Sequence, residues 1–263
     1  MKKPLEIKGI RFGEGRPVIC VPVVEREREA VTEKIRALAG RQTQMIEWRA
    51  DCFEQLDQPE QVRGILEDIG PFVKDTVMLF TIRTKHQGGN ADLEEKRLLY
   101  LDEIAAKSGS IDLIDLEHFE LDRPEREITR LQKMGVHVIS SHHDFSGTPH
   151  DVVLHTLMNQ LTRGGGDIAK IAVMPQSADD VARLFQLTNE TRTSHPDLPL
   201  IAIAMGALGV ISRVSGETFG SCVTFGADGE CSAPGQLQAD ELAGILNVLH
   251  ESMTNAQGDE RDG

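Results

Sequence analysis

The chain has 263 residues, with 42 acidic against 28 basic side chains and a formal net charge of −14 at pH 7. A chain of this length forms one large barrel or two small domains, and it can bury about 75% of its unfolded surface. The negative charge, with no basic cluster on any segment, argues against a nucleic-acid partner, so an anionic small molecule would need individual arginines to bind it.

Cysteine usage and hydropathy favour a cytoplasmic protein. Cys20, Cys52, Cys222 and Cys231 form no CxxC pair, which favours reduced thiols over a disulfide framework or a zinc site. No apolar signal region and no apolar run of membrane-spanning length occur, so neither secretion through a signal peptide nor a membrane partner is expected. The last residues are polar, and we expect a single domain at 1–250 followed by a disordered tail at 251–263.

Short apolar runs alternate with helical periodicity along the whole chain. A weakly alternating segment at 5–12 comes first and is predicted to form a hairpin. Strands are then predicted at residues 18–24, 45–50, 77–82, 113–116, 136–141, 168–174, 200–205 and 222–225. Helices follow them at residues 27–38, about 62–69, 93–106, from about 124, 149–161, 178–188, 210–214 and 239–249, and Ser177 is predicted to cap the sixth.

Eight successive β–α units predict a parallel sheet covered by helices, because the strands are apolar on both faces. Eight units in about 250 residues fit an α/β fold made of a single (β/α)8 TIM barrel, with the leading hairpin closing its N-terminal end. An open doubly wound sheet is the alternative, but no GxGxxG motif or P-loop follows the first strand.

Lys170 lies in the otherwise apolar strand predicted at 168–174, between the glycines at 164–166 and Pro175. Burial disfavours the ammonium form and can lower the pKa of an amine by up to ~3–5 units. A neutral amine is a nucleophile, so Lys170 is a candidate for Schiff-base chemistry. The alternative is a lysine that pairs with a carboxylate in a polar layer of the core.

Further polar side chains occur at the same ends of the predicted strands. The active site of such a barrel is formed at the C-terminal ends of its strands. Any one of these residues could form a structural ion pair, but their recurrence at one end indicates a site. The set comprises Glu47, Arg49, Arg83, Asp115, Glu117, His142, His143, Lys170, Arg213 and Gln236.

The adjacent histidines His142 and His143 require a choice, because alternate side chains of a strand point to opposite faces. Their spacing does not decide which one faces the barrel interior. Beside a buried lysine, the inward histidine would supply a proton shuttle that titrates near neutrality.

Six segments resemble, in order along residues 5–250, the type I 3-dehydroquinate dehydratase family. The segments are residues 47–51, 111–117, 143–145, 170–175, 209–213 and 232–236. The lysine strand and the last two segments are the most specific of them.

The resemblance implies a (β/α)8 barrel without cofactor or metal, usually a homodimer, that dehydrates the anion 3-dehydroquinate to 3-dehydroshikimate in the third step of the shikimate pathway. By matching motif, Lys170 resembles the imine-forming lysine and His143 the general acid/base. Arg213 and Gln236 resemble contacts to the substrate carboxylate and a hydroxyl group. The other matches are Glu47, Arg49 and Arg83 as ring-hydroxyl contacts, Ser232 and Ala233 in a closing loop, and Met205.

The chain departs from the family pattern beside the expected base. Gln87 occupies a position where the family has an acid four residues after the arginine, and an amide cannot take up a proton. His142 stands where the family commonly has a smaller amide. We expect neither departure to touch Lys170 or His143.

These residues suggest a mechanism in which Lys170 forms an imine and His143 acts as base and then acid, a role that suits a pKa near 7. Asp115 and Glu117 are expected either to orient His143 or the arginines, or to form ion pairs of the core. The segment 226–236 has the glycine and proline content of a lid, and a plain surface loop is the alternative.

Two other functions are open at this point. A divalent-metal barrel would use Glu47, Asp115, Glu117 and His142 as ligands, but it would leave Lys170 without a role. A non-catalytic barrel would bind a carboxylate metabolite through Arg49, Arg83 and Arg213.

Overall fold

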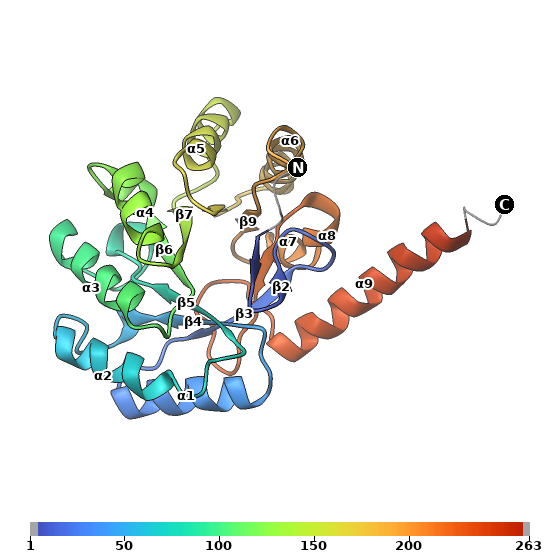
Figure 1. Ribbon diagram of the computed structural model, residues 1–263. Coiled ribbons are helices and arrows are strands. Elements are labelled where there is room, and N and C mark those ends of the chain that lie inside the picture. Colours follow the sequence, from blue (N-terminus) through green and yellow to red (C-terminus); the bar gives the residue numbers. More distant parts are fainter. Residues whose placement is uncertain (1–4, 260–263) are drawn as a thin grey trace.

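The computed structural model describes residues 5–259, and it has a closed ring of parallel strands surrounded by helices (Figure 1). Over these residues the main sheet has eight strands. They are β3 (Val18–Val23), β4 (Met45–Arg49), β5 (Val77–Thr81), β6 (Leu113–Glu117), β7 (His137–Asp144), β8 (Ile168–Val173), β9 (Leu200–Ala204) and β10 (Val223–Phe225). The predicted (β/α)8 barrel is confirmed.

The strands follow one another around the barrel in chain order, with β10 paired to β3. The remaining seam joins β9 to β10 through a parallel bridge between Leu200 and Ser221 and a hydrogen bond from the Cys222 N–H to the Leu200 carbonyl at 2.7 Å. Closure at this seam brings the C-terminal ends of all the strands around a single opening.

Helices cover the outside of the barrel. They are α1 (Arg28–Gly40), α2 (Pro59–Ile69), α3 (Glu95–Lys107), α4 (Pro124–Gln132), α5 (Asp151–Arg163), α6 (Ala178–Ser194), α7 (Val210–Val214), α8 (Gly216–Phe219) and α9 (Ala239–Asp259). Three short 3-10 helices follow strands at the open end, namely η1 (Ala50–Cys52), η2 (Lys85–Gln87) and η3 (His118–Glu120). At the start of α6, Ser177 accepts from the Asp180 N–H in a capping box, as the sequence predicts.

A hairpin closes the other end of the barrel. Strands β1 (Glu6–Ile7) and β2 (Ile10–Arg11) pair antiparallel, and Ile7 and Phe12 are buried in the same cluster as the inward apolar side chains of the strands. Lys8 fixes the hairpin to the barrel, since its ammonium group donates to the carbonyls of Val73 and Thr76 and to Asp112 at 2.7–2.9 Å. The predicted hairpin is therefore confirmed.

The strands bury one set of side chains inside the barrel and the other set beneath the helices. Inside, Met45, Leu79, Leu113 and Ile139 pack in one layer near the closed end. Above this layer the inward positions become polar at the strand ends, so the apolar interior forms the floor of a polar site.

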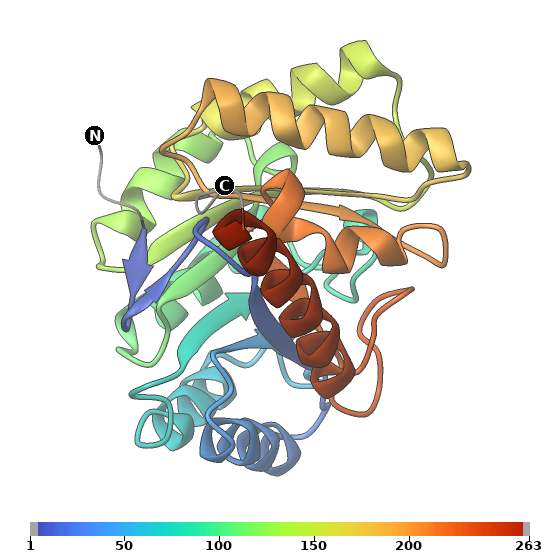
Figure 2. The same cartoon turned by 90° about the vertical axis from the view of Figure 1, so that its right-hand side faces the viewer.

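Helix α9 extends away from the body of the barrel and ends beyond it (Figures 1 and 2). It continues to Asp259, ten residues past the predicted end. Residues 251–259, expected to be a disordered tail, are therefore helical, while residues 260–263 lie outside the described part. Among the described helices, none combines the length and the apolar character that crossing a membrane requires.

Candidate active site

A cavity of about 160 Å³ opens at the C-terminal ends of the barrel strands. It brings together side chains from β4, β7, β8, β9 and β10, from the segment after β5 and from the loop after β10. Of the residues selected from the sequence, it is lined by Glu47, Arg49, Arg83, Gln87, His143, Lys170, Met205, Arg213, Ser232, Ala233 and Gln236. Asp115 and Glu117 do not line the cavity, but they contact residues that do.

Lys170 lies on the cavity wall and is only 3% exposed. Its Nζ atom donates to Asp115 Oδ2 at 2.7 Å and lies 4.8 Å from the centre of the Phe225 ring. Lys170 is therefore paired with a carboxylate, as the alternative interpretation expects, and it also faces an open volume. The pair places the negative charge of Asp115 directly beside the Lys170 amine.

Arg83 connects the two acids of β6 in a buried layer beside Lys170. Its Nη2 atom lies 2.8 Å from Asp115 Oδ1 and its Nη1 atom 2.9 Å from Glu117 Oε1. Burial by itself would raise the pKa of Asp115, but the charges of Arg83 and Lys170 outweigh burial and hold that pKa far below its usual range. For Glu117 burial prevails over Arg83 and the pKa is raised. Asp115 therefore supplies a fixed negative charge under Lys170.

The two histidines of β7 face opposite sides of the barrel wall. His143 lines the cavity, whereas His142 packs its ring edge-on against Phe119 at a centroid distance of 5.1 Å. The inward neighbour Ser141 donates to Asp115 Oδ1 at 2.5 Å, which confirms the alternation along the strand. His143 is thus the histidine that shares the cavity with Lys170.

The expectation that the departure at Gln87 leaves His143 untouched is wrong, because Gln87 contacts His143 directly and determines the state of its ring. Its Oε1 atom accepts from the His143 backbone N–H at 2.8 Å and lies 3.3 Å from His143 Nδ1. Because an amide oxygen can only accept, Nδ1 carries the proton and Nε2 keeps its lone pair. Burial, reinforced by the charges of Arg83 and Lys170, lowers the pKa of His143 well below its ordinary value. The sequence led us to expect a pKa near 7, whereas the site favours a neutral imidazole.

The environments of His143 and His137 predict that their pKa values shift in opposite directions. A hydrogen bond to Asp167 raises the pKa of His137, which lies at the start of the same strand. In an NMR titration of the ring protons, we expect His143 to titrate below pH 6.5, the ordinary value, and His137 above it. Signals are assigned with His143→Ala and His137→Ala. A midpoint for His143 at or above the ordinary value would contradict the proposed environment.

Arg213 is a buried cation whose charge has no acidic partner among the described residues. It is 2% exposed, donates through Nη2 to the Pro234 carbonyl at 2.9 Å, and its Nε atom has no hydrogen-bond partner. Burial lowers the pKa of Arg213 to about 10. An anion in the cavity would supply the missing countercharge, so this guanidinium is the natural carboxylate site.

Glu47 and Arg49 form the opposite wall. Glu47 accepts from the Thr81 hydroxyl at 2.8 Å, and Arg49 is held by Asp51 through two hydrogen bonds of 2.8 Å. The two hydrogen bonds to Asp51 fix the orientation of the Arg49 guanidinium group at the cavity wall.

The chain segment after Arg83 has no room for a side chain at Gly89. A Cβ atom at this position would lie 2.1 Å from the Arg83 carbonyl oxygen.

The loop after β10 covers the cavity. Gln236 accepts from the Ser232 N–H at 2.8 Å and donates to the Ser232 hydroxyl at 2.9 Å, so it braces the loop internally. At its base, Asp228 is held by Lys34 at 2.8 Å and by Arg41 at 2.6 Å. Of the segment 226–236, Ser232, Ala233, Pro234 and Gln236 line the cavity, and a role as a lid stays a prediction.

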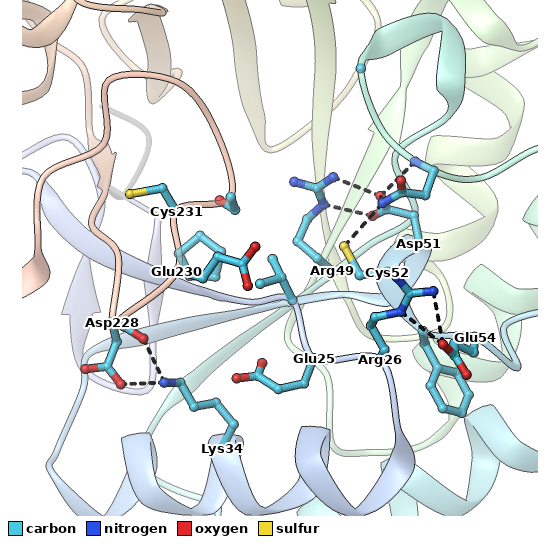
Figure 3. A pocket seen from close by; sticks show the side chains of 16 residues that line it. Glu25, Arg26, Lys34, Arg49, Asp51, Cys52, Glu54, Asp228, Glu230 and Cys231 are labelled. Atoms are coloured by element: carbon cyan, nitrogen blue, oxygen red, sulfur yellow. Dashed lines mark hydrogen bonds and ion pairs between the residues drawn. The ribbon is translucent and has the colours of Figure 1, made fainter.

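A second cavity of about 530 Å³ adjoins the first and shares Arg49, Gly88 and Ser232 with it. Figure 3 shows its charged wall, where Lys34 turns toward Asp228 and Arg49 toward Asp51. Most of these charges are paired, and the Arg49 side chain stands between the two cavities. We interpret this volume as the outer part of the same opening.

The four donors considered for a metal do not assemble into a ligand set. His142 faces away from the cavity, and Asp115 and Glu117 are engaged by Arg83. Within residues 5–259, no group of three or more acidic, histidine or cysteine side chains is placed to hold a metal ion.

Several cavity residues were not selected from the sequence. They are Gly88, Phe145, Ala172, Ile203, Pro234 and Phe225. Ala172 lies two positions after Lys170 and Ile203 two positions before Met205, so strand alternation could have indicated both. Phe145 belongs to a loop, and no periodic signal predicts where its ring lies.

Comparisons with known proteins agree with this geometry. A family model of type I 3-dehydroquinase matches residues 19–253. The 3-dehydroquinate dehydratase of Clostridioides difficile is 37% identical over 254 residues, covering 96% of this chain and 100% of the relative. That of Bacillus licheniformis is 38% identical over 257 residues, with the same coverage.

Two solved structures are similar along nearly their whole length. The 3-dehydroquinate dehydratase from Geobacillus kaustophilus superposes with a TM-score of 0.90 at 37% identity, covering 95% of this chain and 97% of that one. The type I enzyme from Clostridium difficile, solved with covalent modified comenic acid, has a TM-score of 0.90 at 38% identity and coverages of 96% and 100%.

Proposed function

Because the chain belongs to the type I 3-dehydroquinase family, we propose that its cavity dehydrates 3-dehydroquinate through a covalent imine on Lys170. The activity is that of a 3-dehydroquinate dehydratase, a hydro-lyase of the shikimate pathway. The observation that carries the proposed mechanism is a buried amine that faces the same cavity as a neutral histidine and a buried arginine without an acidic partner.

Lys170 is proposed as the nucleophile. After Lys170 loses its ammonium proton to water, the amine adds to the substrate ketone. The hydroxyl group of the adduct then takes up a proton and leaves as water, so that an iminium ion remains. The positive nitrogen withdraws electrons and acidifies the neighbouring C–H bond. The charge of Asp115, 2.7 Å from Nζ, supports this cation throughout.

His143 is proposed as the base and then the acid. Its Nε2 lone pair removes the acidified proton and the electrons move into an enamine. The enamine expels the β-hydroxyl group, which leaves as water with the proton that His143 returns. Hydrolysis of the product imine then releases 3-dehydroshikimate and restores the amine of Lys170.

Arginines and a glutamate are proposed to hold the substrate. Arg213 pairs with the carboxylate, and Gln236 contacts a hydroxyl group when its loop closes. Glu47, Arg49 and Arg83 contact the ring hydroxyls from the other wall. These fixed groups can bind an anion despite the negative net charge of the chain, because their charges act at short range in a buried site.

Borohydride trapping tests the covalent mechanism. We expect 3-dehydroquinate with borohydride to add the mass of the reduced imine to the peptide that contains Lys170. Excess EDTA should leave turnover unchanged, whereas a metal-dependent barrel would lose it. A wild-type protein that binds 3-dehydroquinate but gains no mass would identify the barrel as a carboxylate-binding protein and refute the imine.

Arg213→Ala is expected to raise KM for 3-dehydroquinate by about 10- to 100-fold, since a hydrogen bond to a charged group contributes about 1.5–3 kcal/mol. Steady-state kinetics measure the change. The matched control is Arg26→Ala, which removes an exposed guanidinium paired with Glu54 at the neighbouring cavity. An unchanged KM in Arg213→Ala would reject the carboxylate contact.

A homodimer and a cytoplasmic location stay predictions. Sedimentation velocity at micromolar concentration tests the first, and fractionation of cells that produce the protein tests the second.

A further inference from the structure

A chain of hydrogen bonds leads from the proposed base to the rim of the barrel. Gln87, which is 1% exposed, accepts from His143 through Oε1 and donates through Nε2 to Glu120 Oε1 at 3.3 Å. Gln87 lies in η2 after β5, Glu120 in η3 after β6 and His143 in β7, and these three strands are neighbours in the sheet (Figure 1). Glu120 does not line the cavity, and the proposed reaction assigns it no step.

We propose that Glu120 is a positioning residue, which fixes the amide of Gln87 and thereby the tautomer of His143. The inference rests on the proposed function, since it concerns which nitrogen of the proposed base faces the reaction. Glu120 acts only through Gln87.

An amide has two unlike ends, and only one orientation suits the base. With the oxygen toward His143, Nδ1 must carry the proton, and Nε2 is free to accept one. With the amide turned over, its NH2 group would face the His143 backbone N–H, and Nδ1 would become the acceptor. The neutral ring would then carry its proton on Nε2, where it could not act as a base.

Glu120 favours the productive orientation because a carboxylate only accepts. Its Oε1 atom meets the Gln87 NH2 group, whereas a turned amide would bring two oxygens together. The other oxygen, Oε2, lies 3.1 Å from Nδ1 of His86, an exposed ring on the side away from Gln87. The side chain of Glu120 is 27% exposed, so it can be replaced without opening the core.

The backbone supports the same orientation from the opposite side. The His143 N–H donates to Gln87 Oε1 at 2.8 Å, which by itself opposes a turned amide. Loss of Glu120 therefore weakens the arrangement and does not remove it, and the expected effect is smaller than loss of the base itself.

Kinetics of three variants test the role. Glu120→Ala should lower kcat by about tenfold with KM little changed, a part of the ~10²–10⁴-fold that general acid–base catalysis supplies. Glu120→Gln should restore kcat, since its carbonyl oxygen can accept from Gln87. His86→Ala removes the other partner of Glu120 and should leave kcat unchanged. A wild-type kcat in Glu120→Ala would overturn the proposal.

Ring nitrogen NMR tests the tautomer without relying on activity. Long-range 1H–15N spectra of the wild type should show His143 protonated on Nδ1, with a fraction shifted to Nε2 in Glu120→Ala. In the Gln87→Glu variant both side-chain oxygens at position 87 can accept, so this side chain needs no particular orientation. Adding Glu120→Ala to that variant should therefore leave the tautomer of His143 unchanged. An unaltered tautomer in the single variant overturns the positioning role, whereas a failed borohydride trap in the wild type overturns only the function.

Discussion

Lys170→Met abolishes turnover of 3-dehydroquinate and the borohydride adduct together, if the amine is the nucleophile. Methionine keeps the unbranched shape of the side chain but has no nitrogen to form an imine. Because Arg213, Arg49 and Gln236 remain in place, we expect the variant still to bind the substrate. Isothermal titration measures binding, and mass spectrometry with borohydride measures the covalent step. Turnover near the wild-type rate would refute the mechanism.

Loss of stability is the competing explanation and has its own control. Removing one partner of a buried ion pair can cost about 3–5 kcal/mol when the other charge is left uncompensated. Here Arg83 still lies 2.8 Å from Asp115, so we expect a smaller cost. The double variant Lys170→Met/Asp115→Asn also removes the Asp115 carboxylate charge, which the single variant leaves without its lysine partner. If the double variant melts like the wild type and remains inactive, the missing amine explains the inactivity.

His143→Ala is expected to lower kcat by about 10²–10⁴-fold, the usual contribution of general acid–base catalysis. KM should change little, since the arginines hold the substrate. Imine formation needs Lys170 and not the base, so borohydride should still trap an adduct in this variant. Stopped turnover with continued trapping would separate the proton transfer from the covalent step.

The neighbouring His142 provides the matched control. It has the same chemistry, one position along β7, but it packs against Phe119 outside the cavity. His142→Ala should therefore keep a wild-type kcat. Equal losses in the two variants would indicate a general disturbance of the strand, and a wild-type kcat in His143→Ala would exclude this histidine as the base.

Much of the fold follows from local patterns. The apolar runs of the strands and the helical spacing between them determine eight β–α units, and most predicted boundaries differ from the observed ones by at most three residues. The exceptions are α6, which ends at Ser194 and not at 188, and α9, where a polar continuation predicts a tail and the helix continues to Asp259. The polar composition of this segment indicates that its side chains are poorly buried. A helix nevertheless forms there, because its backbone hydrogen bonds are made within the helix and do not depend on burial.

The partners of the site residues depend on how neighbouring strands align. In the sheet register Lys170 lies opposite Ser141, which lies opposite Glu117, while Asp115 is two residues earlier on its strand. Lys170 nevertheless pairs with Asp115, whereas Glu117 accepts from the backbone N–H and the hydroxyl group of Thr84. A lysine can be recognised as unusual from its own strand, but the identity of its acid cannot.

The sequence by itself determined the barrel, the lysine and the residues at the strand ends, because each depends on the periodicity of a short segment. The family resemblance selected His143 over His142, and the tertiary structure shows that it lines the cavity. Only the tertiary structure decided that Asp115 holds Lys170, that Arg213 lacks an acidic partner among the described residues, and that Gln87 connects His143 to Glu120. These are contacts between segments far apart in the chain. Their geometry follows from strand register and loop conformation, which no local pattern specifies.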